Sequence, residues 1–269
     1  MQTGVIKHLS FIFIKEEFIM SVFDNFNINY YGNIEDKRVV LLQSGGLDSC
    51  VLASLFHRFG FEIHHLFVDY GFNSAKRDLK NAKKIVEKYG GELHVVKLDM
   101  PWLKDSTCLV EGGTVDDTKF GDEAMNTYYA GTYVPMRNTF LISIASSLCE
   151  SLGINYIATA LDGAEDLITH KPLGGTSDKH PTFVQKLEDA INEGSSEHHI
   201  KGTNIRILTP IMGFIKEDTI QMGELLGTDF SISNSCYSDG EEPCGICSAC
   251  VIRKEAFKAV GIKDPIFNK

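Results

Sequence analysis

The sequence contains no apolar run that approaches the length of a membrane-spanning helix. Such a helix needs about 20 consecutive apolar residues, and the apolar stretch near the N-terminus covers only residues 9–14. That stretch is also too short for the h-region of a secretory signal, and the charged Lys15-Glu16-Glu17 follows it without a cleavage-like site. We therefore expect no membrane partner and a cytoplasmic location.

An excess of positive charge is also missing. The 26 Lys and Arg residues are outnumbered by 36 Asp and Glu residues, which gives a formal net charge of -10 at pH 7. Broad electrostatic binding to nucleic acid is therefore not expected. The 269 residues, 43% of them hydrophobic, contain no internal repeat and no low-complexity segment. This composition predicts a globular chain with one large core, or one core and an appendage.

One short stretch combines a buried strand, a glycine turn and the start of a helix. Residues 39–42 are all aliphatic and predict a buried parallel strand, and a helical pattern begins at Leu47. The turn and the helix start read Ser44-Gly45-Gly46-Leu47-Asp48-Ser49. Free N–H groups at a helix N-terminus, beside glycines that let the backbone come close, bind phosphate well. No G-K-[ST] follows, so this is not a Walker loop. The stretch resembles the loop of the PP-loop ATP pyrophosphatases, and the Asp48 carboxylate indicates either Mg²⁺ or helix capping.

The rest of the chain alternates between strand and helix patterns. Strands are predicted at 39–42, 61–69, 92–98, 154–159 and 205–208, and helices at 47–59, 74–89, 138–152, 182–193, 216–226 and 249–260. This order predicts an α/β fold, a five-stranded parallel Rossmann-like sheet with helices on both faces. We expect an ATP-binding domain at 36–230, a small C-terminal lobe at 231–269, and a lead-in of uncertain structure at 1–35.

Four cysteines lie close together in the C-terminal lobe. Cys236, Cys244, Cys247 and Cys250 follow the pattern C-x₇-C-x₂-C-x₂-C. In a reduced compartment, four thiolates suit a closed tetrahedral Zn²⁺ site with a structural role. An Fe–S cluster is the alternative, because four cysteines also hold such clusters.

Motifs along the chain now combine into one pattern. The loop at 44–49 and the cysteines at 236–250 occur with Val68-Asp69-Tyr70-Gly71, Tyr133-Val134-Pro135-Met136-Arg137-Asn138 and Thr209-Pro210-Ile211. In this combination and order, residues 38–260 resemble the 7-cyano-7-deazaguanine synthase (QueC) family. The resemblance implies an ATP-dependent ligase of the queuosine pathway. Such an enzyme adenylates 7-carboxy-7-deazaguanine and uses ammonia to form the nitrile.

The resemblance also implies a role for particular residues. The catalytic residues would be Asp48, Arg137 and Lys216. The nucleotide would be bound by Ser44, Gly45, Gly46, Leu47, Asp48, Ser49 and Asp69, and the small-molecule substrate by Tyr133, Asp162 and Glu165. The expected cofactors are ATP, Mg²⁺ and Zn²⁺, with the zinc on the four cysteines. The oligomeric state is left open, with a homodimer as one alternative.

Two segments depart from the family pattern. Residues 160–175 lack the aromatic and Cys-Arg elements of the family's substrate loop, and Phe72-Asn73 stand where the family has a basic pair. An alternative is therefore a QueC-like enzyme with another acceptor, which transfers a deazaguanine acid to an amine of a protein or nucleic acid. A second alternative is a non-catalytic nucleotide-binding partner protein. The intact Ser44, Asp48 and Ser49 argue against it.

Overall fold

The computed structural model describes residues 36–110, 132–162 and 177–267 of the chain, and its centre is one parallel sheet. The strands are β1 (Arg38–Leu42), β2 (Glu62–Asp69), β3 (Glu92–Lys97), β4 (Tyr156–Ala158) and β5 (Arg206–Leu208), in the spatial order β3-β2-β1-β4-β5. The chain runs outward from β1 to β3 and then returns to β4 on the other side of β1. The carboxyl ends of β1 and β4 therefore form a switch point, where ligands bind in such sheets.

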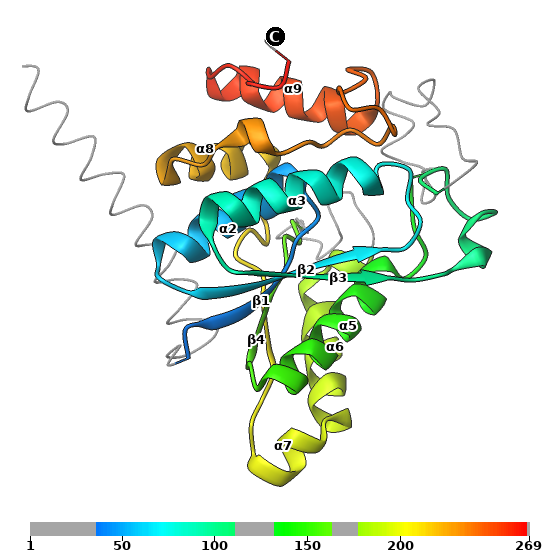
Figure 1. Ribbon diagram of the computed structural model, residues 1–269, viewed down its shortest axis with the longest axis vertical. Helices are drawn as coiled ribbons and strands as arrows, with labels where there is room; N and C mark the ends of the chain where they lie inside the picture. The colour runs from blue at the N-terminus through cyan, green and yellow to red at the C-terminus, as the bar shows by residue number, and fades with distance from the viewer. Residues whose placement is uncertain (1–35, 111–131, 163–176, 268–269) are drawn as a thin grey trace, which may run out of the picture.

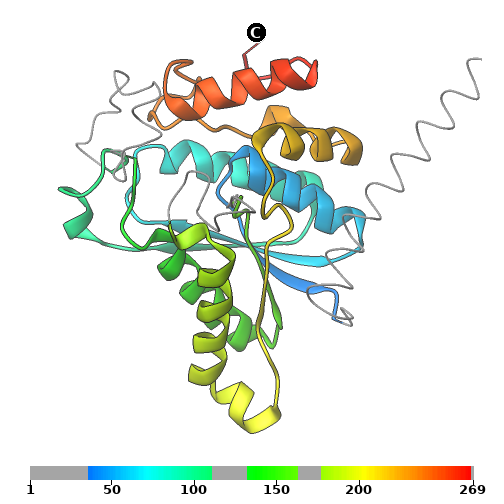
Figure 2. The ribbon, with the colours of Figure 1, turned by 180° about the vertical axis from the view of Figure 1, so that it is seen from behind.

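Helices cover both faces of the sheet, as the sequence predicts (Figure 1). On one face lie α2 (Leu47–Arg58) and α3 (Ala75–Tyr89), with α8 (Lys216–Leu226) and α9 (Ser248–Val260) stacked outside them. On the other face lie α5 (Arg137–Leu152), α6 (Pro181–Gly194) and the short α7 (Ser196–Lys201), which Figure 2 shows from behind. Three 3-10 turns, η2 (Pro101–Leu103), η4 (Ser177–Lys179) and η5 (Phe230–Ile232), complete the described elements.

The central strand β1 is buried on both faces because its side chains alternate between two cores. Val39 and Leu41 pack in the cluster formed with α2, α8 and α9. Val40 packs in the cluster formed with α5 and α6, beside Ile142 and Ile157. Full burial of such an aliphatic side chain contributes about 1.5–3 kcal/mol. An aliphatic run without polar alternation is what a parallel strand between two helix layers requires.

The last helix shares the main core instead of forming one of its own. Phe257 of α9 makes an edge contact with Phe230 at a centroid distance of 5.1 Å, and both belong to the cluster that contains α2. The guanidinium of Arg253, whose side chain is only 1% exposed, pairs with Asp264 at 2.8 Å. Arg253 also donates to the carbonyl oxygens of Phe230 and Ser233. The cysteines form a separate small cluster, and the expected domain boundary at residue 231 stays a prediction.

Among the described residues, no helix has both the length and the apolar character that crossing a membrane requires. The predicted strands and helices are confirmed, with ends that differ by a few residues at most. Helix α7 and the three 3-10 turns were not predicted, because they are too short to carry a periodic pattern.

Candidate active site

A polar cavity of about 660 Å³ lies at the carboxyl ends of β1 and β4, at the switch point of the sheet. Its lining comes from every layer of the fold. Its polar and aromatic lining residues include Ser44, Asp48, Ser49, Tyr70, Phe72, Asp78, Arg137, Asp162, Lys179, Lys216 and Tyr237. Residues of the loop at 44–49 form one wall, and the ligand-binding role of this loop stays a prediction.

The glycines shape the loop by allowing close contact with α3. Gly45 has φ +74°, and a Cβ at this position would lie 2.2 Å from the backbone oxygen of Asp78. Only glycine fits both the dihedral angle and the contact. The carbonyl oxygen of Gly45 accepts a hydrogen bond from the N–H of Asn234 at 3.1 Å. Helix α3 and the segment before the cysteines therefore hold the loop from two sides.

The hydroxyl groups of the loop belong to a chain of buried hydrogen bonds. Ser49 Oγ lies 3.1 Å from Ser44 Oγ and 2.9 Å from the side-chain amide of Gln43. Oε1 of Gln43 lies 3.1 Å from Nδ1 of His65. Nε2 of His65 lies 3.0 Å from the carbonyl oxygen of Gly90. His65 thus positions Ser49 through Gln43, a connection between β1, β2 and α2 that the sequence pattern did not indicate.

Burial keeps the ring of His65 neutral. The side chain is fully buried, and this burial lowers the pKa of His65 to about 4. A neutral ring carries one N–H, which donates from Nε2 to Gly90, so Nδ1 accepts. In the structure the Gln43 amide donates from Nε2 to Ser49 Oγ and presents Oε1 to Nδ1 of His65; a neutral ring with its proton on Nε2 favours the reverse orientation of this amide.

Four charged side chains, Asp48, Lys216, Asp162 and Lys179, form a chain of contacts on the cavity wall. Nζ of Lys216, at the start of α8, lies 2.7 Å from both carboxylate oxygens of Asp48. The same Nζ lies 3.9 Å from Asp162, and Lys179 binds the other oxygen of Asp162 at 2.7 Å. Burial alone would lower the pKa of Lys216, but the Asp48 and Asp162 carboxylates outweigh it and the pKa is raised. Lys216 therefore stays charged inside the cavity.

Arg137 provides a second cation, at the start of α5. Its guanidinium hydrogen-bonds the hydroxyl of Tyr70 and also lies near Tyr237 and Asp178. Burial opposes its charge, yet the pKa of Arg137 is raised by these neighbours. A cation at a helix N-terminus is unfavourable unless an anion is near. Arg137 and Lys216 both occupy such positions and both line the cavity, which favours an anionic ligand between them.

Arg77 and Asp78 connect the loop to the cysteine segment, although no periodic or motif signal in the sequence marks them. Arg77, at 3% exposure, donates to the carbonyl oxygens of Cys236, Ser238 and Gly240. The carboxylate of Asp78 accepts from Arg77 and from the hydroxyl of Ser74. Burial raises the pKa of Asp78 to about 6 despite these partners. This pair ties α3 to the backbone of the cysteine cluster.

The four cysteine sulfurs have the spacing of a single tetrahedral ion. Their Sγ atoms all lie within 4.8 Å of one another. Two of the Sγ–Sγ distances, Cys244 to Cys250 and Cys236 to Cys247, are 4.0 Å. Four sulfurs at about 2.3 Å from a tetrahedral Zn²⁺ are about 3.8 Å apart. Thiolates that each bind a different iron of a four-iron cluster lie farther apart, so the donor set fits a mononuclear ion such as Zn²⁺.

Backbone N–H groups aim at two of these sulfurs. Sγ of Cys236 accepts from the N–H groups of Ser238 and Cys244, and Sγ of Cys244 accepts from the N–H of Cys247. Such contacts stabilise thiolate charge and orient the ligands. The cysteine pattern predicted from sequence is thus brought together in space.

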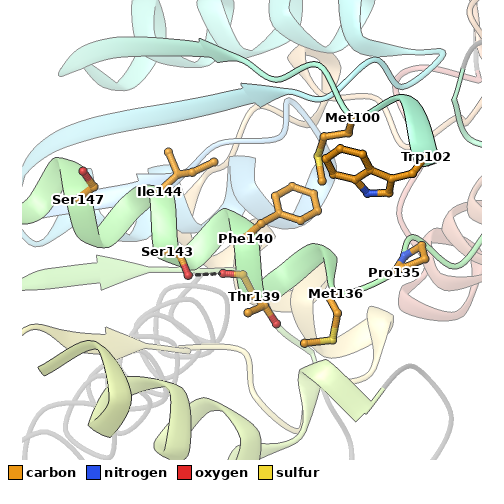
Figure 3. Close-up of a pocket in the computed structure, with 9 residues that line it drawn as sticks. All are labelled: Met100, Trp102, Pro135, Met136, Thr139, Phe140, Ser143, Ile144 and Ser147. Atoms are coloured by element: carbon orange, nitrogen blue, oxygen red, sulfur yellow. Dashed lines mark hydrogen bonds between the residues drawn. The ribbon is translucent and has the colours of Figure 1, made fainter. Parts of the chain in front are cut away.

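A second groove, about 640 Å³ in volume, runs along the other side of α5 (Figure 3). It is lined by Met100, Trp102, Pro135, Met136, Thr139, Phe140, Ser143, Ile144 and Ser147. No charged side chain is found among these described lining residues, so the groove offers nothing to neutralise a triphosphate. The polar cavity is therefore the better candidate for an ATP site.

Three of the predicted site residues lie elsewhere or cannot be placed. Asp69 caps the end of β2, where its Oδ1 accepts from the N–H of Gly71 at 3.0 Å, and it does not line the cavity. Tyr133 also lies outside the described lining, with its hydroxyl 3.5 Å from the N–H of Met136. Glu165 falls outside the described residues. The binding roles of all three stay predictions.

Comparisons with known proteins agree with the motifs. Residues 38–261 match the family model described as "Queuosine biosynthesis protein QueC". The 7-cyano-7-deazaguanine synthase of Methanosphaerula palustris is 31% identical over 230 residues, which cover 85% of this chain and 98% of that protein. The synthase of Oceanobacillus iheyensis is 29% identical over 232 residues, covering 86% and 97%.

Solved structures are more distant from this chain. The NMN synthetase of Francisella tularensis gives a TM-score of 0.46 at 13% identity, covering 93% of this chain and 87% of that one. The NH3-dependent NAD synthetase of Campylobacter jejuni gives a TM-score of 0.41 at 17% identity, covering 81% of this chain and 74% of that one. These values are too low to transfer any site residue.

Proposed function

The chain belongs to the QueC family, and on that premise we propose that it is an ATP-dependent ligase that converts 7-carboxy-7-deazaguanine and ammonia to 7-cyano-7-deazaguanine. One observation carries the proposal: the phosphate loop, Lys216 and Arg137 all line the same polar cavity. A loop for phosphates and two buried cations are what the activation of a carboxylate by ATP requires.

The proposed reaction assigns distinct tasks to the groups of the cavity. A carboxylate oxygen of the substrate attacks the α-phosphorus of ATP, and pyrophosphate leaves. Ammonia then attacks the acyl carbon and AMP leaves, which gives an amide. A second ATP activates the amide oxygen in the same way, and loss of AMP and a proton gives the nitrile. The backbone N–H groups at the start of α2 and the hydroxyls of Ser44 and Ser49 would bind the phosphates.

The charged side chains would stabilise the negative charge that develops on the phosphates. Lys216 and Arg137 enter the cavity from the N-termini of two helices. Tyr70, Phe72 and Tyr237 add aromatic faces to the same lining, and planar bases stack well on such faces. Asp162 forms a hydrogen bond of 2.7 Å with Lys179, and this pair in the cavity lining would contact the substrate.

Asp48 would hold Mg²⁺ together with phosphate oxygens, because this ion prefers hard oxygen ligands. When bound, the ion would supply charge neutralisation on the phosphates. Lys216 contacts both carboxylate oxygens of Asp48, so the lysine and the ion would share this carboxylate. In the C-terminal segment, we propose a structural Zn²⁺ on Cys236, Cys244, Cys247 and Cys250, supported by the sulfur spacing.

The test follows the three products of the reaction. The protein is incubated with ATP, Mg²⁺, ammonia and 7-carboxy-7-deazaguanine, and AMP, pyrophosphate and the product mass are measured. Formation of the nitrile with two AMP per product supports the proposal. Failure to release AMP with this carboxylate under any condition of ammonia and Mg²⁺ would refute it.

The departures in residues 160–175 and at Phe72-Asn73 favour one second candidate. In this case the cavity adenylates a deazaguanine acid and transfers it to an amine of a macromolecule. AMP release without nitrile, restored only by an added amine acceptor, would identify this activity. A protein that binds ATP but releases no AMP with any acceptor would instead be the non-catalytic partner protein. The homodimer stays a prediction.

A further inference from the structure

Four polar side chains gather near the amino ends of β2 and β3, outside the lining of the cavity. In the parallel register, His64 pairs with Glu92 and Leu66 pairs with His94. Side chains two residues apart on a strand share one face, so Glu62, His64, Glu92 and His94 all lie on one face. His64 lies two residues before Leu66, the first residue of β2 that lines the cavity, and none of these four described side chains is among the lining residues. This group is therefore separate from the proposed ATP site.

The side chains of this group already have the geometry of metal ligands. Nδ1 of His64 lies 3.1 Å from Nε2 of His94, and Oε2 of Glu92 lies 3.9 Å from the same Nδ1. The three ligand atoms all lie within 4.8 Å of one another. Two imidazole nitrogens bound at about 2.1 Å to one ion are about 3.0–3.4 Å apart. The observed spacing of the two nitrogens falls within that range.

A carboxylate on the far side of His64 sets its tautomer. Nε2 of His64 lies 3.2 Å from Oε1 of Glu62, so this nitrogen carries the proton and donates it to the carboxylate. Nδ1 therefore presents a lone pair toward His94 and Glu92. A carboxylate that accepts from the second nitrogen is the usual arrangement of a metal-bound histidine. The alternative explanation of the 3.1 Å contact is a hydrogen bond between two neutral rings, in which His94 donates.

We propose that His64, His94 and Glu92 form a second metal site, for a divalent transition metal, with Glu62 as the residue that orients His64. Two imidazoles and one carboxylate suit Zn²⁺, Co²⁺, Ni²⁺ or Cu²⁺ and disfavour Mg²⁺ and Ca²⁺. The side chains of Glu62 and Glu92 are 64% and 68% exposed, so an ion can enter from solvent. Bound there, the ion joins the edge strand β3 to β2 and stabilises that edge of the sheet.

The test uses the full chain with its cysteine site loaded with one equivalent of Zn²⁺, and Ni²⁺ as the probe. Equilibrium dialysis with metal analysis gives the stoichiometry, and thermal unfolding gives the midpoint with and without Ni²⁺. We expect a second equivalent and a higher midpoint, because a ligand that binds only the folded state stabilises it. The variant His64→Ala/His94→Ala should lose both effects and keep the cysteine-bound zinc.

The matched control is His198→Ala/His199→Ala, which also removes a pair of neighbouring histidines and should keep the second equivalent. Glu62→Gln changes only an exposed carboxylate and should weaken Ni²⁺ binding about 10- to 100-fold, which tests the site even if the histidine variant folds poorly. A single metal equivalent in the parent at saturating Ni²⁺ would overturn the proposal. A second equivalent of metal that binds both His64→Ala/His94→Ala and Glu62→Gln with unchanged affinity would also overturn the proposal.

Discussion

Lys216 and Asp48 form a two-point contact, in which Nζ of the lysine lies 2.7 Å from each carboxylate oxygen. The contact joins the first turn of α8 to the first turn of α2. Both N-termini carry positive dipole ends, so Lys216 adds positive charge where the dipoles are already positive. The carboxylates of Asp48 and Asp162 offset this charge. We infer that the site accumulates positive potential for an anionic ligand.

The first prediction concerns Lys216. Lys216→Met keeps the length of the side chain and removes its charge. We expect AMP formation to fall about 100- to 1,000-fold, the usual loss when one preorganised donor to a transition state is removed. The unfolding midpoint should change little. Lys80→Met is the matched control, because Lys80 forms an exposed ion pair with Glu241, and it should keep the parent rate. An equal rate in both variants would contradict the role of Lys216.

Asp48→Ala tests the predicted ligand of Mg²⁺. We expect the fold to remain intact and AMP production to be abolished, because the loop then has no carboxylate for the ion. The measurement is AMP release at several Mg²⁺ concentrations, together with thermal unfolding. Asp189→Ala, on the surface of α6, is the control and should behave like the parent. Turnover by Asp48→Ala at the parental rate would remove the basis for the Mg²⁺ role.

Gly45→Ala tests the close contact between the loop and α3. Gly45 and Gly60 share a positive φ, +74° and +72°, but only at Gly45 would a Cβ meet backbone, 2.2 Å from the oxygen of Asp78. Gly60→Ala should therefore cost only about 1–2 kcal/mol of unfolding free energy, the strain of the left-handed region. Gly45→Ala should cost more and also lose AMP formation, because the loop must shift. Equal losses of stability, with turnover retained, would show that the contact is unimportant.

Cys247→Ser tests the structural metal. We expect metal content to fall below one per chain and the unfolding midpoint to drop by roughly 5–10 °C, since metal binding contributes to folding. Cys108→Ser is the control, because Cys108 lies outside the four-sulfur group. The measurements are metal analysis and thermal unfolding. An unchanged midpoint for Cys247→Ser, with metal lost, would argue against a structural role.

Sequence patterns sufficed for the features that depend on local order along the chain. The parallel sheet follows from aliphatic runs such as residues 39–42 alternating with helices. The phosphate loop and the four cysteines follow from short spacings. Arg137 was predicted because it belongs to the motif at 133–138, and Lys216 because it opens the predicted helix that follows Thr209-Pro210-Ile211.

Contacts between distant segments carry no such local pattern. Arg77 reaches the carbonyl oxygens of residues 236–240, and nothing in the sequence around it distinguishes it from the other cations of an amphipathic helix. His65 and Gln43 likewise meet only after β1 and β2 pair. Two histidines in one strand, His64 and His65, point to opposite faces, so their sequence adjacency hides two different environments.

The last prediction concerns the pH dependence of stability that His65 should cause. Its pKa is lowered by burial to about 4 in the folded protein, against about 6.5 in the unfolded chain. Between these pH values the unfolded chain binds a proton at His65 that the folded chain does not. The free energy of unfolding should therefore decrease as the pH falls from about 6.5 to about 4, by about 3 kcal/mol from this group.

Urea unfolding of the parent and of His65→Gln across this pH range measures the contribution of His65 to the free energy of unfolding. Burial raises the pKa of Asp78 to about 6, so Asp78 contributes a pH dependence of opposite sign. Both proteins contain Asp78, so its contribution cancels when the two free energies of unfolding are subtracted. The gap between parent and variant should narrow toward low pH, since the variant has no group to protonate at this position. His199→Gln, which replaces an exposed histidine, should leave the pH dependence of the parent unchanged. A gap that widens toward low pH would mean that His65 is protonated between two oxygen atoms, and the neutral ring inferred for the Ser49 hydrogen-bond chain would be wrong.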